Sequence, residues 1–225
     1  MEMSDLMTLM KARRSYRAFK PANVPDEAIR NILEAGRWAP SSANSQPWDF
    51  IVIRDKETKQ KIQENIRTVI EKISSLRDFP FLRTFTADYM LQAPVQIVVC
   101  GDPRFKRVSM MNQVDEQIEQ FAFWGSVSMA VQNMLLAIHA QGLGSAVFTD
   151  IYPDDIKAIL GVPEPLKVIC ILPVGYPAEE RDLGYRREIE EFTHRERYDR
   201  SKLRSESFVE EARKDPYTML VKRSR

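Results

Sequence analysis

Three arginines and a serine lie close together in the segment Arg13-Arg14-Ser15-Tyr16-Arg17. Arginine is the side chain best suited to bidentate hydrogen bonding with a phosphate group. Alternate residues of an extended backbone share one side, so Arg13, Ser15 and Arg17 would face the same ligand. The segment therefore predicts a phosphate site. A solvated basic face is the alternative interpretation, and these five residues alone leave both open.

A second segment, Ala39 to Trp48 (APSSANSQPW), places small polar residues between two prolines. Proline restricts the backbone, so the hydroxyls and amides between the two are held in few positions. Asn and Gln each offer a donor and an acceptor on one planar group, which suits the edge of a heteroaromatic ring. The same residue types also form plain turns between a helix and a strand. The loop thus predicts either a ring-binding site or a connecting turn.

Other common chemistries have no support in the sequence. A Gly-x-Ser-x-Gly nucleophile motif and a P-loop are absent from the chain. Gly142-Leu143-Gly144 lacks a third glycine and follows a helix, so it indicates helix termination rather than a dinucleotide turn. We expect His139 to be a core or interface residue and His194 to be solvated, because neither has metal-ligand partners at suitable spacing. No catalytic side chain and no metal are therefore predicted.

The elements that must position these segments follow from hydrophobic periodicity and from proline and glycine signals. Helices are expected over residues 4–12, from Pro25 to before Pro40, and over 56–75, 116–141 and 153–160; strands are expected over 49–54, 95–100, 145–148 and 167–174. Strands separated by helices imply one layered α/β or α+β domain. Residues 186–225 are charged and cannot build a core, so this tail either covers the body or a partner subunit, or it frays.

Composition excludes several classes of partner. The 33 Lys+Arg against 32 Asp+Glu give a net charge of +1. The chain therefore lacks the overall basic excess that is typical of proteins that bind nucleic acid. Residues 120–149 carry no charged side chain and are long enough to cross a bilayer, but recurring Ser, Gln, Asn and His favour a buried core or interface helix. Cys100 and Cys170 lie in apolar runs, as buried thiols of a cytoplasmic protein do. The N-terminus lacks a signal-peptide pattern.

Together, the two polar segments resemble signatures of the nitroreductase family. The helical segment 130–137, the following Gly142-Leu143-Gly144-Ser145 and the strand end Leu172-Pro173-Val174-Gly175-Tyr176-Pro177 are also similar to that family. The resemblance covers roughly residues 5–198. It implies an α+β, three-layer α/β/α sandwich with a mixed sheet, assembled as an intertwined homodimer. Residues 1–200 would form the FMN-binding domain and residues 201–225 a charged C-terminal extension.

The resemblance also implies roles for particular residues around FMN at the dimer interface. Phosphate, ribityl chain and pyrimidine edge would be held by Arg13, Arg14, Ser15 and Arg17, and the isoalloxazine would be bordered by Pro40, Ser41, Ser42, Asn44 and Gln46 of the other subunit. Val147, Phe148 and Thr149 match the strand end near flavin N5, and Arg186 matches a late phosphate-binding arginine, with Arg187 as its competitor. The chain departs from the family pattern at Glu188, Tyr198 and Thr149-Asp150.

The implied activity is ping-pong reduction of an electron-poor acceptor, such as a nitroaromatic, a quinone or an enone, with NADH or NADPH as donor. Two alternatives use the same scaffold: cleavage of flavin to dimethylbenzimidazole, and removal of halogen from tyrosines. A third alternative is a non-catalytic flavin-binding protein whose basic tail, with Lys214, Lys222, Arg223 and Arg225, docks a partner.

Overall fold

A computed structural model describes residues 2–76, 87–107, 116–149 and 151–214. Its helices are α1 (Met3–Ala12), α2 (Asp26–Arg37), α3 (Lys56–Leu76), α4 (Tyr89–Gln92), α5 (Glu116–Ala140), α6 (Pro153–Leu160) and α7 (Glu206–Lys214). Its strands are β1 (Trp48–Ile53), β2 (Val95–Gly101) and β3 (Lys167–Val174). Short 3-10 turns are η1 (Ser42–Asn44), η2 (Pro103–Arg107), η4 (Ile189–Glu191) and η5 (Arg200–Lys202).

The three strands form an antiparallel sheet in the order β1-β2-β3, and every residue of the central strand is buried. The one parallel pairing in the described residues is an isolated bridge between Ser15 and Ser145. The sheet that the resemblance implied as mixed is therefore mixed only through this bridge. This arrangement brings the N-terminal arginine segment against the chain that follows α5.

The strand predicted over residues 145–148 is wrong, because this segment pairs only at isolated bridges. Gly144 bridges to Gly175 and Phe148 to Ile171, both antiparallel and in one register. That register places Ala146 opposite Pro173, which has no N–H to donate to a ladder. The segment consequently lies along the end of β3 without becoming a regular strand.

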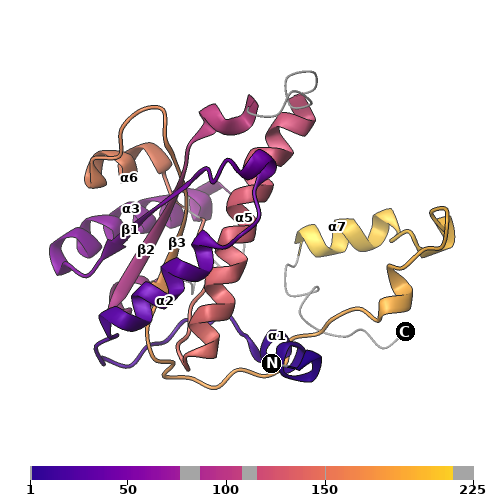
Figure 1. The fold of residues 1–225 in the computed structure, drawn as a ribbon, viewed down its shortest axis with the longest axis horizontal. Coiled ribbons are helices and arrows are strands. Elements are labelled where there is room, and N and C mark those ends of the chain that lie inside the picture. The colour runs from indigo at the N-terminus through magenta and orange to yellow at the C-terminus, as the bar shows by residue number, and fades with distance from the viewer. Residues whose placement is uncertain (1, 77–86, 108–115, 150, 215–225) are drawn as a thin grey trace.

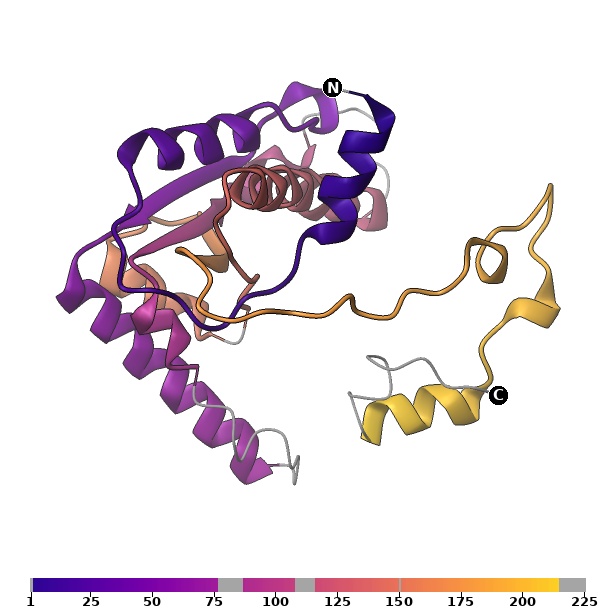
Figure 2. The same cartoon turned by 90° about the horizontal axis from the view of Figure 1, so that it is seen from below.

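Helices cover both faces of the sheet, which confirms the three-layer arrangement (Figure 2). Strand alternation explains it: Val95, Ile97 and Val99 pack in a cluster with α2 and α5, whereas Val98 and Cys100 pack in a second cluster with α3, α4 and α6. The layer of α2 and α5 is close-packed. A Cβ added at Gly36 would lie 3.0 Å from Cγ of Met134 and from Cζ of Phe50.

Helix α5 is, among the described residues, the one helix long and apolar enough to cross a membrane by length and composition. Two of its polar side chains are nevertheless hydrogen-bonded to other parts of this chain. Asn133 donates to the carbonyl of Ala35 at 3.1 Å, and the hydroxyl of Ser126 accepts from the amide of Ser42. These bonds fit the predicted core helix, because hydrocarbon offers no such partners.

The two cysteines lie in the two different hydrophobic clusters, Cys100 with α3 and Cys170 with α5, and both are free. Burial raises the pKa of the Cys100 thiol to about 11 and that of Cys170 to about 12, so the reactive thiolate is scarce near neutral pH. We expect iodoacetamide at pH 8 to label neither cysteine in the folded protein and both in urea, as measured by the mass of the intact chain. Rapid labelling without denaturant would contradict this burial.

After β3 the chain leaves the body as an extended arm that carries η4, η5 and α7 (Figures 1 and 2). A hydrogen bond of 2.9 Å from Nε of Arg14 to the carbonyl of Asp182 ties the base of this arm to the body. Residues 201–214 of the predicted extension continue the arm. Residues 215–225, with the basic residues Lys222, Arg223 and Arg225, lie outside the described part of the chain.

Candidate functional site

The arginine segment is fixed in place by close backbone packing. The amide of Tyr16 donates to the carbonyl of Ser145 at 3.0 Å. A Cβ added at Gly144 would lie 2.8 Å from Cδ2 of the Tyr16 ring and 2.9 Å from Cγ of Pro177. Only glycine lets the two segments approach this closely. Gly144, which we predicted as a helix terminator, thus also seats the arginine segment.

The guanidinium groups of Arg13, Arg14 and Arg186 lie near one another, and no described carboxylate forms an ion pair with any of them. The pKa of Arg13 is lowered, first by burial and then by the positive charges of Arg186 and Arg14. Within the described residues, none of these arginines forms an ion pair, and neither does Arg17. Cations assembled without counter-charge form a site for an anion, and their mutual repulsion would be relieved by a phosphate dianion.

The individual arginines differ in how much of their hydrogen-bonding capacity remains for a ligand. Arg14 is largely committed, because it donates to the carbonyls of Asp182, Lys11 and Arg13. Arg186 uses one donor on the carbonyl of Tyr185. No hydrogen-bond acceptor is found for the Arg13 guanidinium in the described chain. The geometry thus makes Arg13 and Arg186 the main candidates for phosphate contacts, with Arg14 as a brace.

Arg186, rather than Arg187, lies with this cluster. The positive charge of Arg186 lowers the pKa of Arg13. Arg187 instead donates to the carbonyl of Glu191 at 2.5 Å and pairs with the carboxylate of Glu191 at 3.4 Å. Arg187 also lies over the Phe192 ring. The geometry therefore favours Arg186 over Arg187 as the candidate for the phosphate site.

His139, in the last turn of α5, lies near the arginine cluster. From the sequence, this histidine was expected only to be a core or interface residue. The pKa of its imidazole is lowered, first by burial and then by the charges of Arg13 and Arg14. A charge-free imidazole beside guanidiniums leaves the cation excess to the arginines. Its sequence position gave no sign of this proximity.

The loop between α2 and β1 is strained and braced from within. Ala43, Asn44 and Gln46 have φ values of 51°, 52° and 46°. Residues other than glycine rarely adopt this backbone conformation. The Ser41 hydroxyl accepts from the amide of Gln46 at 3.0 Å, and the Gln46 side chain donates to the carbonyl of Asn44 at 3.3 Å. Pro40 is exposed and Ser42 is half-buried. Strain held by surrounding contacts is typical of binding loops, so the geometry favours a ligand loop over a plain turn.

In the segment 147–149, the two outer residues, Val147 and Thr149, are accessible to a ligand, whereas the middle residue, Phe148, is not. Phe148 is buried, and both its amide and its carbonyl pair with Ile171 at 3.0 and 2.9 Å. Val147 and Thr149 are exposed. A backbone donor for a flavin ring must then come from Val147 or Thr149, not from Phe148, whose role is in the core. Asp150, to which no role was given, lies outside the described residues.

Within one chain, the polar loop lies beside the middle of α5, whereas the arginine segment lies beyond the C-terminal end of this helix. The loop is bonded to Ser126, whereas the arginine segment pairs with Ser145, just beyond the end of the helix at Ala140. The stretch of α5 from Ser126 to Ala140 rises roughly 20 Å along its axis. Within one chain, the loop and the arginine segment are therefore well separated along α5.

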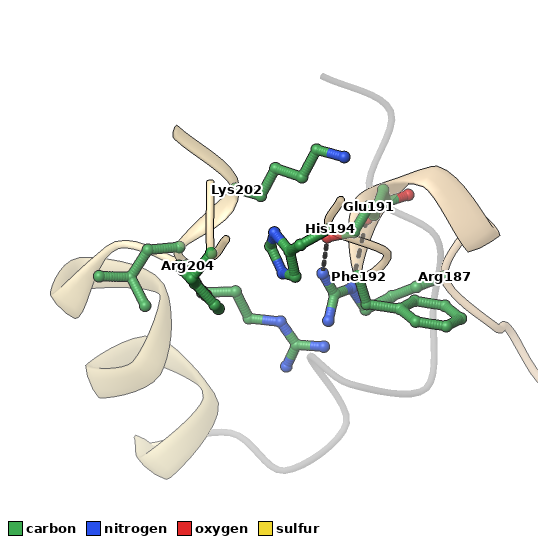
Figure 3. Close-up of a pocket in the computed structure, with 8 residues that line it drawn as sticks. Arg187, Glu191, Phe192, His194, Lys202 and Arg204 are labelled. Atoms are coloured by element: carbon green, nitrogen blue, oxygen red, sulfur yellow. Dashed lines mark hydrogen bonds and ion pairs between the residues drawn. The ribbon is translucent and has the colours of Figure 1, made fainter. Parts of the chain in front are cut away.

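A hollow of about 430 Å³ lies within the arm (Figure 3) and differs from the arginine cluster in the pairing of its cations. Its cations already have partners: Arg187 pairs with Glu191, Lys202 donates to the carbonyls of Glu190 and Thr193, and Arg204 lies over Phe208. His194 stacks on Tyr198 with centroids 4.1 Å apart and accepts from the amide of Asp199, and it remains partly exposed to solvent. These contacts hold the arm in shape.

The chain belongs to the nitroreductase family, whose model matches residues 10–176. A provisionally named NADH dehydrogenase/NAD(P)H nitroreductase of Methanothermobacter thermautotrophicus is 33% identical over 188 residues, which cover 80% of this chain and 82% of the relative. Iodotyrosine deiodinase 1 of Mus musculus is 31% identical over 190 residues, covering 80% of this chain and 65% of the mouse protein. A crystal structure of oxidized iodotyrosine deiodinase bound to FMN and 3-iodo-L-tyrosine has a TM-score of 0.68 at 27% identity and covers 86% of this chain and 100% of that chain. The family and fold implied by the sequence resemblance are thereby confirmed.

Proposed function

We propose that this protein is an FMN-dependent oxidoreductase that uses NADH or NADPH to reduce an electron-poor small molecule, such as a nitroaromatic or a quinone. The observation that carries the proposal is the cluster of Arg13, Arg14 and Arg186, for which the described part of the chain supplies no ion-pairing carboxylate. Membership of the nitroreductase family and a relative crystallised with FMN support the choice of flavin over other phosphorylated cofactors.

The residues present fit FMN. Arg13 and Arg186 would bind the phosphate dianion through charge-assisted hydrogen bonds, while Ser15 and Arg17 lie beside them for the ribityl chain and ring edge. The loop residues Pro40, Ser41, Ser42, Asn44 and Gln46, together with Val147 and Thr149, would border the isoalloxazine. FMN held by these residues would supply two-electron chemistry between the nicotinamide and the second substrate.

The protein's own part in turnover is to bind the cofactor, to orient the substrates and to exclude water. No side chain is required as a dedicated acid or base, since solvent can protonate a reduced acceptor. Donor and acceptor would occupy the same place over the ring in succession, which gives ping-pong kinetics. The rigid loop defines that place, and the arginines hold the cofactor through both halves of the cycle.

A second copy of the chain completes the site. Phe121 is 79% exposed, Met3 73% and Leu183 76%, and large apolar side chains left in water at this density indicate a protein interface. The arm extends from the body with further exposed apolar side chains at Ile189 and Phe192. A C2 dimer would bury these surfaces and bring the loop of one chain to the arginines of its partner. The residues of the site then belong to the FMN-binding domain, residues 1–200. Residues 201–225 are a C-terminal extension of that domain. Such an enzyme would act in the cytoplasm.

A second candidate function, reductive removal of halogen from tyrosines, is favoured by the similarity to iodotyrosine deiodinase. Acceptor selection under matched conditions separates the two. Protein reduced anaerobically with NADPH should be reoxidised by a nitroaromatic or a quinone much faster than by 3-iodotyrosine, as measured by return of the flavin absorbance. Faster reoxidation by 3-iodotyrosine, with release of iodide, would establish the dehalogenase instead. Irreversible loss of the flavin colour in air would point to flavin cleavage.

A further inference from the structure

Helix α5 carries a line of polar side chains on the side that faces α2 and the polar loop. Ser126 and Asn133 of α5, and Gln141 directly after it, are spaced by seven and eight residues, close to two helical turns each. Ser126 bonds to Ser42, Asn133 donates to the carbonyl of Ala35, and Gln141 donates to the carbonyl of Ala28 at 3.4 Å. The line therefore holds the chain from the start of α2 to the loop after it.

Ser126 is the member of this line that reaches the loop. Its side chain is buried, with 1% of the residue exposed. The hydroxyl donates its single proton to the carbonyl of Ala122 at 2.5 Å and accepts from the amide of Ser42 at 3.1 Å. Because the proton is directed back along the helix, the lone pairs of the oxygen are left to face the loop. One buried hydroxyl thus joins α5 to the backbone of the loop.

The anchored amide directly precedes the strained part of the loop. Ala43 and Asn44 follow Ser42 with φ values of 51° and 52°. Non-glycine residues persist in this conformation only where their surroundings over-determine it. The internal bonds of the loop, between Ser41 and Gln46 and between Gln46 and Asn44, close it on itself without attaching it to the body. The bond to Ser126 attaches the loop to a rigid element.

We propose that Ser126 is a positioning residue, which holds the loop Ser41–Gln46 in the shape that receives the flavin ring. The inference rests on the proposed FMN site, since it explains how one wall of that site is held. It assigns a role to a residue that touches no ligand itself and acts through the amide of Ser42.

Three variants of the full-length protein test the proposal. Ser126→Ala removes the acceptor, Ser126→Thr keeps the hydroxyl, and Ser128→Ala is the matched control, an exposed serine on the same helix. Hydrogen exchange of the Ser42 amide in protein without FMN should be faster in Ser126→Ala, while core amides of β2 remain protected. FMN binding, measured by quenching of flavin fluorescence, should weaken roughly tenfold, because the half-buried amide of Ser42 loses the hydroxyl acceptor that ties the loop to α5. Ser126→Thr and Ser128→Ala should resemble the wild type in both measurements.

The two measurements separate this inference from the function it rests on. Unchanged exchange of the Ser42 amide in Ser126→Ala would overturn the positioning role whether or not the protein binds FMN. Faster exchange with unweakened FMN binding would also overturn it, because the loop would then be irrelevant to the cofactor. Failure of the wild-type protein to bind FMN would overturn the proposed function, while the exchange measurement would still decide whether Ser126 holds the loop.

Discussion

The double variant Arg13→Ala/Arg186→Ala should fold normally and be unable to retain FMN. Neither guanidinium forms an ion pair with any residue that the structure describes, so their removal breaks no ion pair among those residues. Each charge-assisted contact to a phosphate contributes about 1.5–3 kcal/mol, so losing two should weaken FMN binding by about a hundredfold or more. The measurement is FMN affinity from fluorescence quenching, together with the thermal unfolding midpoint as a check of folding.

Arg187→Ala is the matched control, because Arg187 is adjacent in sequence but pairs with Glu191 inside the arm. This variant should bind FMN as the wild type does. A second check needs no flavin: Arg13→Ala should raise the pKa of His139, since the nearby positive charge that disfavours the imidazolium is gone. Proton NMR of the imidazole measures this change. A double variant that purifies yellow would contradict the phosphate assignment, and a colourless Arg187→Ala would reassign it.

Mixed dimers should recover a site that neither parent has. One parent is Arg13→Ala/Arg186→Ala, and the other is the loop variant Ser41→Ala/Asn44→Ala, which loses the brace to the amide of Gln46 and a side chain of the ring-binding loop. If the loop of one chain serves the arginines of its partner, the mixed dimer combines one doubly defective site with one fully wild-type site. The effect is large, because it restores binding from near zero to one FMN per dimer.

Co-expression with two different affinity tags and tandem purification isolates the mixed dimer, and flavin absorbance against protein concentration gives the stoichiometry. The two parent homodimers, purified in the same way, are the controls. A mixed dimer as colourless as its parents would place loop and arginines of each site in a single chain, contrary to their separation along α5.

Much of the fold was predictable because its signals are local. The bounds of α6 and β3 agree with the sequence prediction to the residue, since Pro153 and the acids after it mark a helix start and Gly175 follows the strand end. The strand predicted over residues 145–148 failed for a non-local reason, the proline of β3 that faces Ala146 across the register. Helix α4 was missed because four residues give too little periodicity.

The candidate site divides in the same way. The arginine segment and the polar loop were recognisable from residue types within five and ten positions. The bond between Ser42 and Ser126 joins residues 84 positions apart, and the approach of His139 to Arg13 depends on where α5 ends against α1. Such pairings follow from packing, which no local pattern encodes. The selection of Arg186 over Arg187 also required the structure, because the two are adjacent in the sequence.

The most direct measurement is the visible spectrum of the purified protein after incubation with FMN and gel filtration, before and after anaerobic addition of NADPH. We expect a dimer that carries one flavin per chain, whose absorbance bleaches with the nicotinamide and returns when a quinone is added. A monomer that emerges without flavin, or a bound flavin that NADPH leaves oxidised, would contradict a flavin reductase assembled from two chains.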